Sequence, residues 1–115
     1  MTYGRDLAYS VRLLQPAEED ALEYASYIQL KEKSNEAAER WLNGLYNQLQ
    51  GLSELPRRFP VIYEAADLGK EYRSLIYHSH RIIYEVNDST GTVFVHRVYH
   101  GAKQRLTPSD IPPEE

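Results

Sequence analysis

The sequence predicts an α+β domain in which a helical hairpin covers one face of a single sheet. Two long segments, 16–31 and 35–54, repeat apolar residues with the 3.6-residue period of an amphipathic helix. Three later segments, 72–77, 81–87 and 92–100, alternate with the period of two that is typical of strands. Because short connections separate these strands, we expect an antiparallel meander with the helices on one of its faces.

The N-terminal elements are predicted from local signals. Residues 8–14 are β-prone and alternate loosely, so they are expected to form a first strand that joins the sheet. Pro16 suits the first turn of a helix, and the acidic residues 18–20 suit the positive end of the helix dipole. Ser34 is a favoured N-cap for the second helix, and the short link predicts that the two helices are antiparallel.

The remaining segments are expected to be connections. Residues 55–70 contain two prolines and a glycine, and predict a loop with a short strand or turn at 61–63. Residues 87–91 are rich in turn formers and predict a hairpin loop. We expect one domain over residues 1–106, followed at 107–115 by a flexible, acidic, proline-containing tail.

The composition excludes several classes of protein. The chain has 115 residues and a net charge of -4, and it contains no apolar run near the roughly 20 residues that a membrane helix requires. Cysteine is absent, which excludes disulfides and thiolate metal sites. The first residues lack the apolar core of a secretory signal, so we expect a cytoplasmic protein.

The charge is unevenly distributed along the chain. Residues 1–69 carry 7 basic and 11 acidic residues, whereas residues 70–106 carry 6 basic and 3 acidic residues and all four histidines. The tail 107–115 adds three acidic residues. The negative net charge of the chain disfavours binding of free nucleic acid, but the basic region of predicted strands is compatible with a site that faces phosphate.

Four residues of this basic region are candidates for catalysis: Arg73, Arg81, His100 and Lys103. If their strands are neighbours, these side chains could converge. Arginines could then stabilise a pentavalent phosphorane while histidine transfers protons during RNA cleavage. The alternative interpretation is that they are surface cations, some of them paired with neighbouring glutamates.

The histidines also raise the question of a metal site. His78 and His80 are two residues apart, and His96 and His100 are four residues apart, so each pair shares a strand face. No carboxylate is obviously placed to complete a site, and half-buried polar residues are the favoured interpretation. Motifs for phosphate loops, dinucleotide binding, and serine or cysteine nucleophiles are absent, so no cofactor is expected.

The order and spacing of several segments resemble the RelE/ParE toxins of type II toxin–antitoxin modules, and within them the ParE, or plasmid-stabilisation, branch. The match spans about residues 9–106. The residues that carry it are Pro16–Leu22, Ala38–Leu45 with Trp41, Leu55–Pro60, Tyr72–Leu75, His80–Val86 and Arg97–Lys103. The resemblance implies a small cytoplasmic toxin with a helical hairpin on an antiparallel sheet. It also implies a cognate antitoxin that binds the toxin through an extended or helical segment.

The two branches of this family imply different activities. RelE-like members are similar to ribosome-dependent mRNA endonucleases. Here Arg81 matches their arginine after the turn, and Lys103 or His100 matches the late catalytic group, with Tyr99 nearby. The lysine pair of RelE is missing. The segments Tyr72-Arg73 and His100-Gly101 look more like ParE, which implies inhibition of DNA gyrase. A third possibility is a non-toxic member that only binds an antitoxin.

Overall fold

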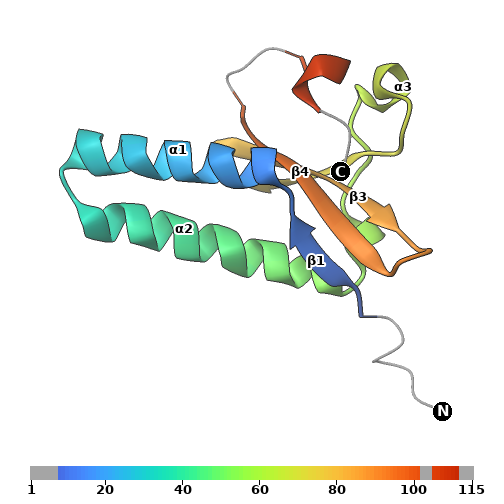
Figure 1. Cartoon of the computed structure of the whole chain (residues 1–115), viewed down its shortest axis with the longest axis horizontal. Helices are drawn as coiled ribbons and strands as arrows, with labels where there is room; N and C mark the ends of the chain where they lie inside the picture. Colours follow the sequence, from blue (N-terminus) through green and yellow to red (C-terminus); the bar gives the residue numbers. More distant parts are fainter. Residues whose placement is uncertain (1–7, 102–104, 112–115) are drawn as a thin grey trace.

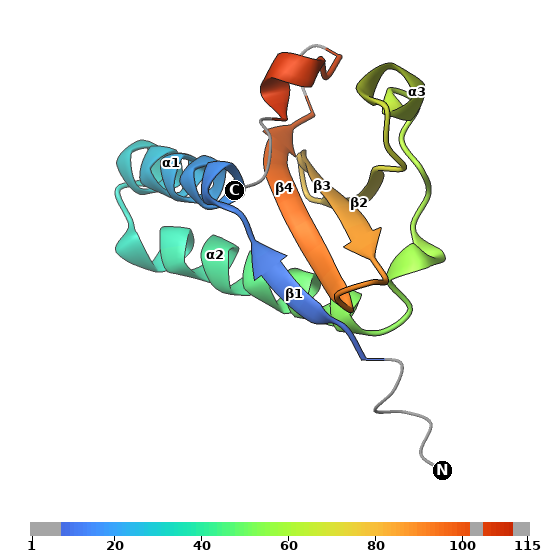
Figure 2. The same cartoon turned by 45° about the vertical axis from the view of Figure 1, so that its right-hand side comes forward.

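The computed structural model describes residues 8–101 and 105–111 of the chain, arranged in three layers. Figure 1 shows helices α1 and α2 side by side on one face of the sheet. Figure 2 shows α3 on the opposite side of the sheet from this hairpin. The C-terminal segment, residues 105–111, packs on that side through Leu106 and Ile111. The elements are β1 (Ser10–Leu13), α1 (Gln15–Glu32), α2 (Asn35–Gln50), α3 (Ala65–Leu68), β2 (Arg73–Tyr77), β3 (His80–Asn87) and β4 (Thr92–His100), with 3-10 turns at Gly51–Ser53, Pro56–Arg58 and Pro108–Asp110.

The helical hairpin forms as the sequence predicts. Pro16 lies in the first turn of α1, where its missing N–H costs no hydrogen bond. Ser34 caps α2, because its Oγ accepts a hydrogen bond from the N–H of Ala37 at 3.0 Å. The buried residues of α1 are all alanines, at positions 17, 21 and 25. Such a surface of small side chains allows the helix to lie close to β4.

The sheet has the strand order β1-β4-β3-β2. The predicted meander of β2, β3 and β4 is confirmed, and β1 joins its far edge in parallel to β4. The sheet is therefore mixed. A register shift between Ile83 and Tyr84 leaves His96 as an extra residue on β4. Such a bulge bends the strand and changes which face the following side chains occupy.

Both faces of the sheet carry a hydrophobic cluster. The helix-facing cluster contains Leu45, Ile82, Tyr84, Val93 and Val95, all fully buried. The second cluster, on the opposite face, consists of Ile62, Tyr72, Ile83, Tyr99 and Leu106, with Ala65, Leu68 and Ile111 against it. The loop 59–68 and the C-terminal segment therefore cover part of this face, to which the sequence analysis assigned no covering element.

The start of the C-terminal tail is held by specific contacts. Thr107 and Asp110 form a capping box around the last 3-10 turn. Arg97 donates a hydrogen bond from Nη1 to the carbonyl oxygen of Asp110 at 2.6 Å. The flexible tail of the sequence analysis includes residues 112–115, which lie outside the described residues, and its flexibility stays a prediction.

Gly44 marks the closest approach of α2 to the sheet. A Cβ at Gly44 would collide with the hydroxyl of Tyr77 and lie 3.2 Å from Cζ of the same ring. Tyr77 cannot move away freely, because it is buried and its hydroxyl donates to the carbonyl oxygen of Trp41 at 2.8 Å. Glycine in a helix is unfavourable on its own, so this close contact explains its presence.

We therefore expect Gly44→Ala to lower the free energy of unfolding by about 1–3 kcal/mol, because overpacking outweighs the gain in helix propensity. Urea denaturation would measure this loss. In the Tyr77→Phe background, which lacks the colliding oxygen, the cost should be clearly smaller. Gly51→Ala is a matched control, since its Cβ would meet only Arg58 at an ordinary 3.6 Å. An equal loss in both glycine variants would contradict the packing explanation.

Candidate functional site

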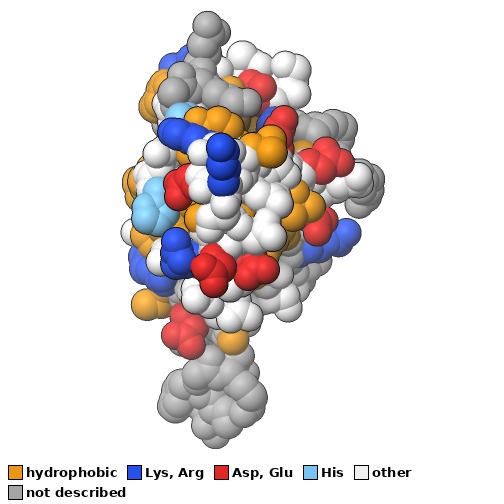
Figure 3. Space-filling model, turned by 90° about the vertical axis from the view of Figure 1, so that its left-hand side faces the viewer, with side chains coloured by type: hydrophobic (Ala, Val, Ile, Leu, Met, Phe, Trp, Pro, Cys, Tyr) orange, Lys and Arg blue, Asp and Glu red, His pale blue; other side chains and the backbone are white. Residues whose placement is uncertain are grey.

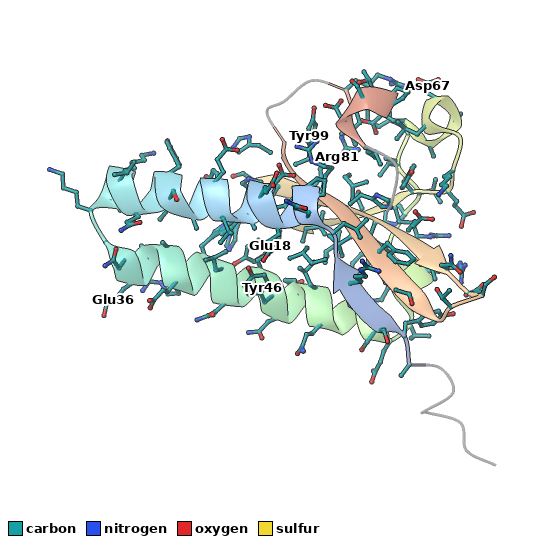
Figure 4. The ribbon with its side chains drawn as sticks, in the orientation of Figure 1. Glu18, Glu36, Tyr46, Asp67, Arg81 and Tyr99 are labelled. Carbon is teal, nitrogen blue, oxygen red and sulfur yellow. The ribbon has the colours of Figure 1, made fainter. Side chains whose placement is uncertain are left out.

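The residues predicted as a catalytic group do not converge in the structure. Arg81 and Tyr99 are register partners on the face of the second cluster, where Figure 4 shows them close together. His100 pairs with His80, whose ring contacts Tyr24 and Trp41, so this pair lies on the helix-facing side. Arg73 pairs with Tyr84, at the opposite end of β2 from the turn. Lys103 lies outside the described residues.

Arg81 is held by a buried carboxylate. Its guanidinium donates two hydrogen bonds to Glu64, at 3.0 Å and 2.7 Å, and Glu64 is fully buried at the start of α3. The N–H of Leu106 donates to the same carboxylate at 3.0 Å. Burial acts to raise the pKa of Glu64, but these hydrogen bonds and the charge of Arg81 outweigh it, and the pKa lies below its usual value. The pair therefore stays ionised and fixes the C-terminal segment to the sheet.

The surface beside this ion pair is aromatic and basic. The exposed ring of Tyr63 lies 5.7 Å from the guanidinium carbon of Arg81 and 4.7 Å from that of Arg105. Arg105 in turn forms an exposed ion pair with Asp67 at 2.8 Å. Burial raises the pKa of Tyr99, which keeps its hydroxyl protonated under ordinary conditions.

Arg73 binds the backbone of the loop that precedes β2. Its Nη1 donates to the carbonyl oxygens of Phe59 at 2.7 Å and Arg57 at 3.2 Å, and its Nη2 pairs with Glu71 at 3.1 Å. Only 14% of the Arg73 side chain is exposed. The side chain thus satisfies backbone groups of the loop rather than facing solvent as a phosphate ligand would.

A second arginine–carboxylate pair joins α1 to β4. Arg97 donates from Nε and Nη2 to the two oxygens of Asp20, at 2.7 Å and 2.8 Å, and the N–H of Val98 donates to the same carboxylate at 3.0 Å. The sequence analysis assigned Asp20 only to the helix dipole, and it gave neither Glu64 nor Arg97 a structural partner. No local signal could have found these pairs, since 77 residues separate Asp20 from Arg97 and 17 separate Glu64 from Arg81.

The four histidines are dispersed. His78 lies in the turn between β2 and β3, whereas His96 faces the second cluster, 2.7 Å from Glu85 and edge-on to Tyr72. His80 and His100 face the helices. Within residues 8–101 and 105–111, no group of three or more His, Cys, Asp or Glu side chains is placed to hold a metal ion.

A pocket of about 470 Å³ lies between α1 and the ends of β3 and β4. Its wall consists of Asp20, Glu23, Tyr24, Tyr27, His80, Val98 and His100. A second groove of about 460 Å³ runs between β1 and α2, and its apolar lining includes Tyr9, Val11, Leu13, Tyr46 and Leu49. Figure 3, which views the molecule from the end of the helical hairpin, shows basic, acidic and hydrophobic side chains mixed on that face.

The sequence matches a family described as "ParE toxin of type II toxin-antitoxin system, parDE" over residues 11–105. The chain belongs to the ParE toxin family. A comparison with curated proteins found no match. Among the described residues, no helix of this ParE-family chain is long and apolar enough to cross a membrane.

Solved structures support the fold of this family member. A structure of the chromosomal ParDE toxin–antitoxin system from P. aeruginosa matches at a TM-score of 0.67 and 12% identity, covering 81% of this chain and 96% of that chain. The RelBE2 toxin–antitoxin complex from Mycobacterium tuberculosis matches at a TM-score of 0.56 and 24% identity, covering 81% of this chain and 98% of that chain. The helical hairpin on a four-stranded sheet is thus the RelE/ParE-like fold.

Proposed function

We propose that this protein is the toxin of a cytoplasmic toxin–antitoxin module, that a cognate antitoxin neutralises it, and that its target is DNA gyrase. The observation that carries the choice of target is the engagement of the strand arginines. Arg73, Arg81 and Arg97 lie on β2, β3 and β4, and each is held by carboxylates or carbonyl oxygens of the protein itself. An RNA-cleaving site would need such cations directed at phosphate.

The antitoxin part of the proposal is supported by exposed apolar surface. The groove between β1 and α2 presents Tyr46, 36% exposed, and on α1 the side chains of Leu22 and Leu30 are 48% and 77% exposed. Such patches on a small protein often mark partner surfaces, and grooves of this kind accept extended or helical segments. Two solved structures with this fold are of toxin–antitoxin systems.

A direct test is to add the purified chain to gyrase supercoiling and cleavage assays, and to induce it in cells while DNA, RNA and protein synthesis are followed separately. We expect blocked supercoiling, a DNA damage response and intact mRNA. Unchanged gyrase activity would overturn the proposed target. Normal growth on strong induction without an antitoxin would instead favour the non-toxic, antitoxin-binding alternative.

One observation favours the alternative of an mRNA endonuclease, namely the adjacency of Arg81, Tyr99, Tyr63 and Arg105. An exposed tyrosine flanked by arginines could stack a nucleobase next to a phosphate. Under this alternative, Tyr63→Ala should abolish mRNA cleavage on induction, and this variant spares the buried ion pair. His100→Ala should leave cleavage at this group unchanged, because His100 lies on the helix-facing side of the sheet. Arg81→Ala is a poorer test, because it leaves Glu64 buried without its partner and loss of toxicity could then reflect unfolding.

A further inference from the structure

We propose that the pocket between α1 and the ends of β3 and β4 binds an arginine side chain of a partner protein. The partner would be the antitoxin, and this part of the inference rests on the function proposed above. The pocket is defined by Asp20, Glu23, Tyr24 and Tyr27 from α1 and by His80, Val98 and His100 from the sheet. We call it the α1 pocket.

The α1 pocket has a nearly continuous wall of aromatic rings. The ring centroids of Tyr24 and Tyr27 are 5.5 Å apart, those of Tyr24 and His80 are 4.3 Å apart, and those of His80 and His100 are 4.9 Å apart. Trp41 supports this wall from α2, at 5.0 Å from Tyr24 and 5.4 Å from His80. Rings held in this way offer flat faces on which a guanidinium can stack at little entropic cost.

Helical spacing places the acidic residues and the tyrosines on the same stripe of α1. Positions 20 and 24 are four residues apart, as are positions 23 and 27, and the pairs 20/23 and 24/27 are three apart. Figure 1 shows that this helix passes across β4. The stripe therefore faces the C-terminal end of that strand, where His100 lies. The pocket follows from the register of α1 against the sheet rather than from a flexible loop.

The charge of the pocket selects a cation. Asp20 is compensated by Arg97, whereas exposed Glu23 has no hydrogen bond or ion pair within the part of the chain that the structure describes. A phosphate or a carboxylate would be repelled by Glu23, and the absence of a three-ligand group among the described residues disfavours a metal ion. The pocket thus combines the carboxylate of Glu23 with the faces of aromatic rings, and this combination suits an organic cation.

The chain already shows that one of these rings accepts a cation. The Nζ of Lys31 lies 5.7 Å from the ring centroid of Tyr27, within the range of a cation–π contact. Arginine is the better occupant of the pocket, because its planar group can stack on a ring while it donates two parallel hydrogen bonds to Glu23. Lysine could satisfy only one of these interactions at a time.

The test uses the full chain and a chemically matched pair of probes. Two-dimensional NMR spectra are recorded during titration with arginine amide and, separately, with citrulline amide, whose side chain has a similar shape but carries no charge. We expect saturable shifts for residues 23–27 and His100 with arginine amide only. Glu23→Gln should weaken this binding about two- to fivefold, as expected for an exposed ion pair, and Tyr27→Ala should weaken it similarly.

Glu39→Gln is the matched control, because Glu39 is an exposed glutamate on α2 away from the α1 pocket. Equal shifts with citrulline amide, or equal weakening by Glu39→Gln, would overturn the proposal. With the cognate antitoxin in hand, Glu23→Gln should weaken the complex by a similar factor, and unchanged affinity would overturn the assignment of the partner. Neither the NMR titration nor the antitoxin affinity depends on gyrase. The proposed gyrase target can therefore fail while this inference stands, and this inference can fail while the gyrase target stands.

Discussion

Glu64→Gln is expected to lower the free energy of unfolding by about 3 kcal/mol, the largest effect of a single substitution that we predict. The fully buried carboxylate is the acceptor for two hydrogen bonds from Arg81 and one from the N–H of Leu106. The amide keeps the shape but leaves the guanidinium of Arg81, a side chain only 18% exposed, without a counter-charge. Urea denaturation followed by circular dichroism would measure the loss.

Two further variants separate this explanation from a general sensitivity to charge removal. The double variant Glu64→Leu with Arg81→Met should recover most of the lost stability, because an apolar pair leaves no uncompensated charge. Asp88→Asn removes the partner of Arg57 in an exposed pair at 3.1 Å, and its effect should be much smaller. Comparable losses in Glu64→Gln and Asp88→Asn would contradict the central role of burial.

The same carboxylate predicts how stability depends on pH. The pKa of Glu64 in the folded protein lies below the usual 4.5, so its ionised form stabilises the fold above pH 4.5. This contribution is lost as the pH falls below 4.5 and through the lowered pKa, because the unfolded chain then binds the proton more readily. The difference in stability between the wild type and Glu64→Gln should therefore narrow in acid. A difference that stays constant over this range would refute the assignment.

Asp20→Asn is the second substitution with a large expected effect, about 2 kcal/mol. Asp20 accepts three hydrogen bonds from β4, two from Arg97 and one from the N–H of Val98, and it is the polar link between α1 and the sheet. The amide can accept only part of this set, and it no longer balances the charge of Arg97. The expected loss is smaller than for Glu64, because 14% of the Asp20 side chain remains in contact with water.

Thermal unfolding and hydrogen exchange would both detect the change at Asp20. Exchange should accelerate at the N–H of Val98 and along α1 before it does in β2, because the substitution releases the helix from the strand. Glu18→Gln is the matched control on the same helix, as its side chain is exposed in the first turn and should cost only a few tenths of a kcal/mol. Equal effects of the two substitutions would show that the link to β4 contributes nothing.

The sequence by itself determined the elements of this fold and most of their order in space. Pro16, Ser34 and the period of the apolar residues predict both ends of the first helix and the start of the second to within one residue. The second helix was expected to reach residue 54, but it ends at Gln50 and continues as a 3-10 turn. The meander follows from short turns between alternating segments. These signals are local, since capping, periodicity and turn formation act between residues that are neighbours in the chain.

The tertiary structure alone decided which side chains meet. Alternation along β3 places Arg81 and His80 on opposite faces, so Arg81 meets Glu64 while His80 and His100 meet Tyr24. The proposed catalytic group was drawn from neighbouring strands without knowledge of these faces. Partners such as Asp20 and Arg97 are selected because a buried charge requires a counter-charge, wherever the chain supplies it. That requirement acts between residues that are close in space but far apart in the chain, so no periodicity in the sequence indicates which residues will pair.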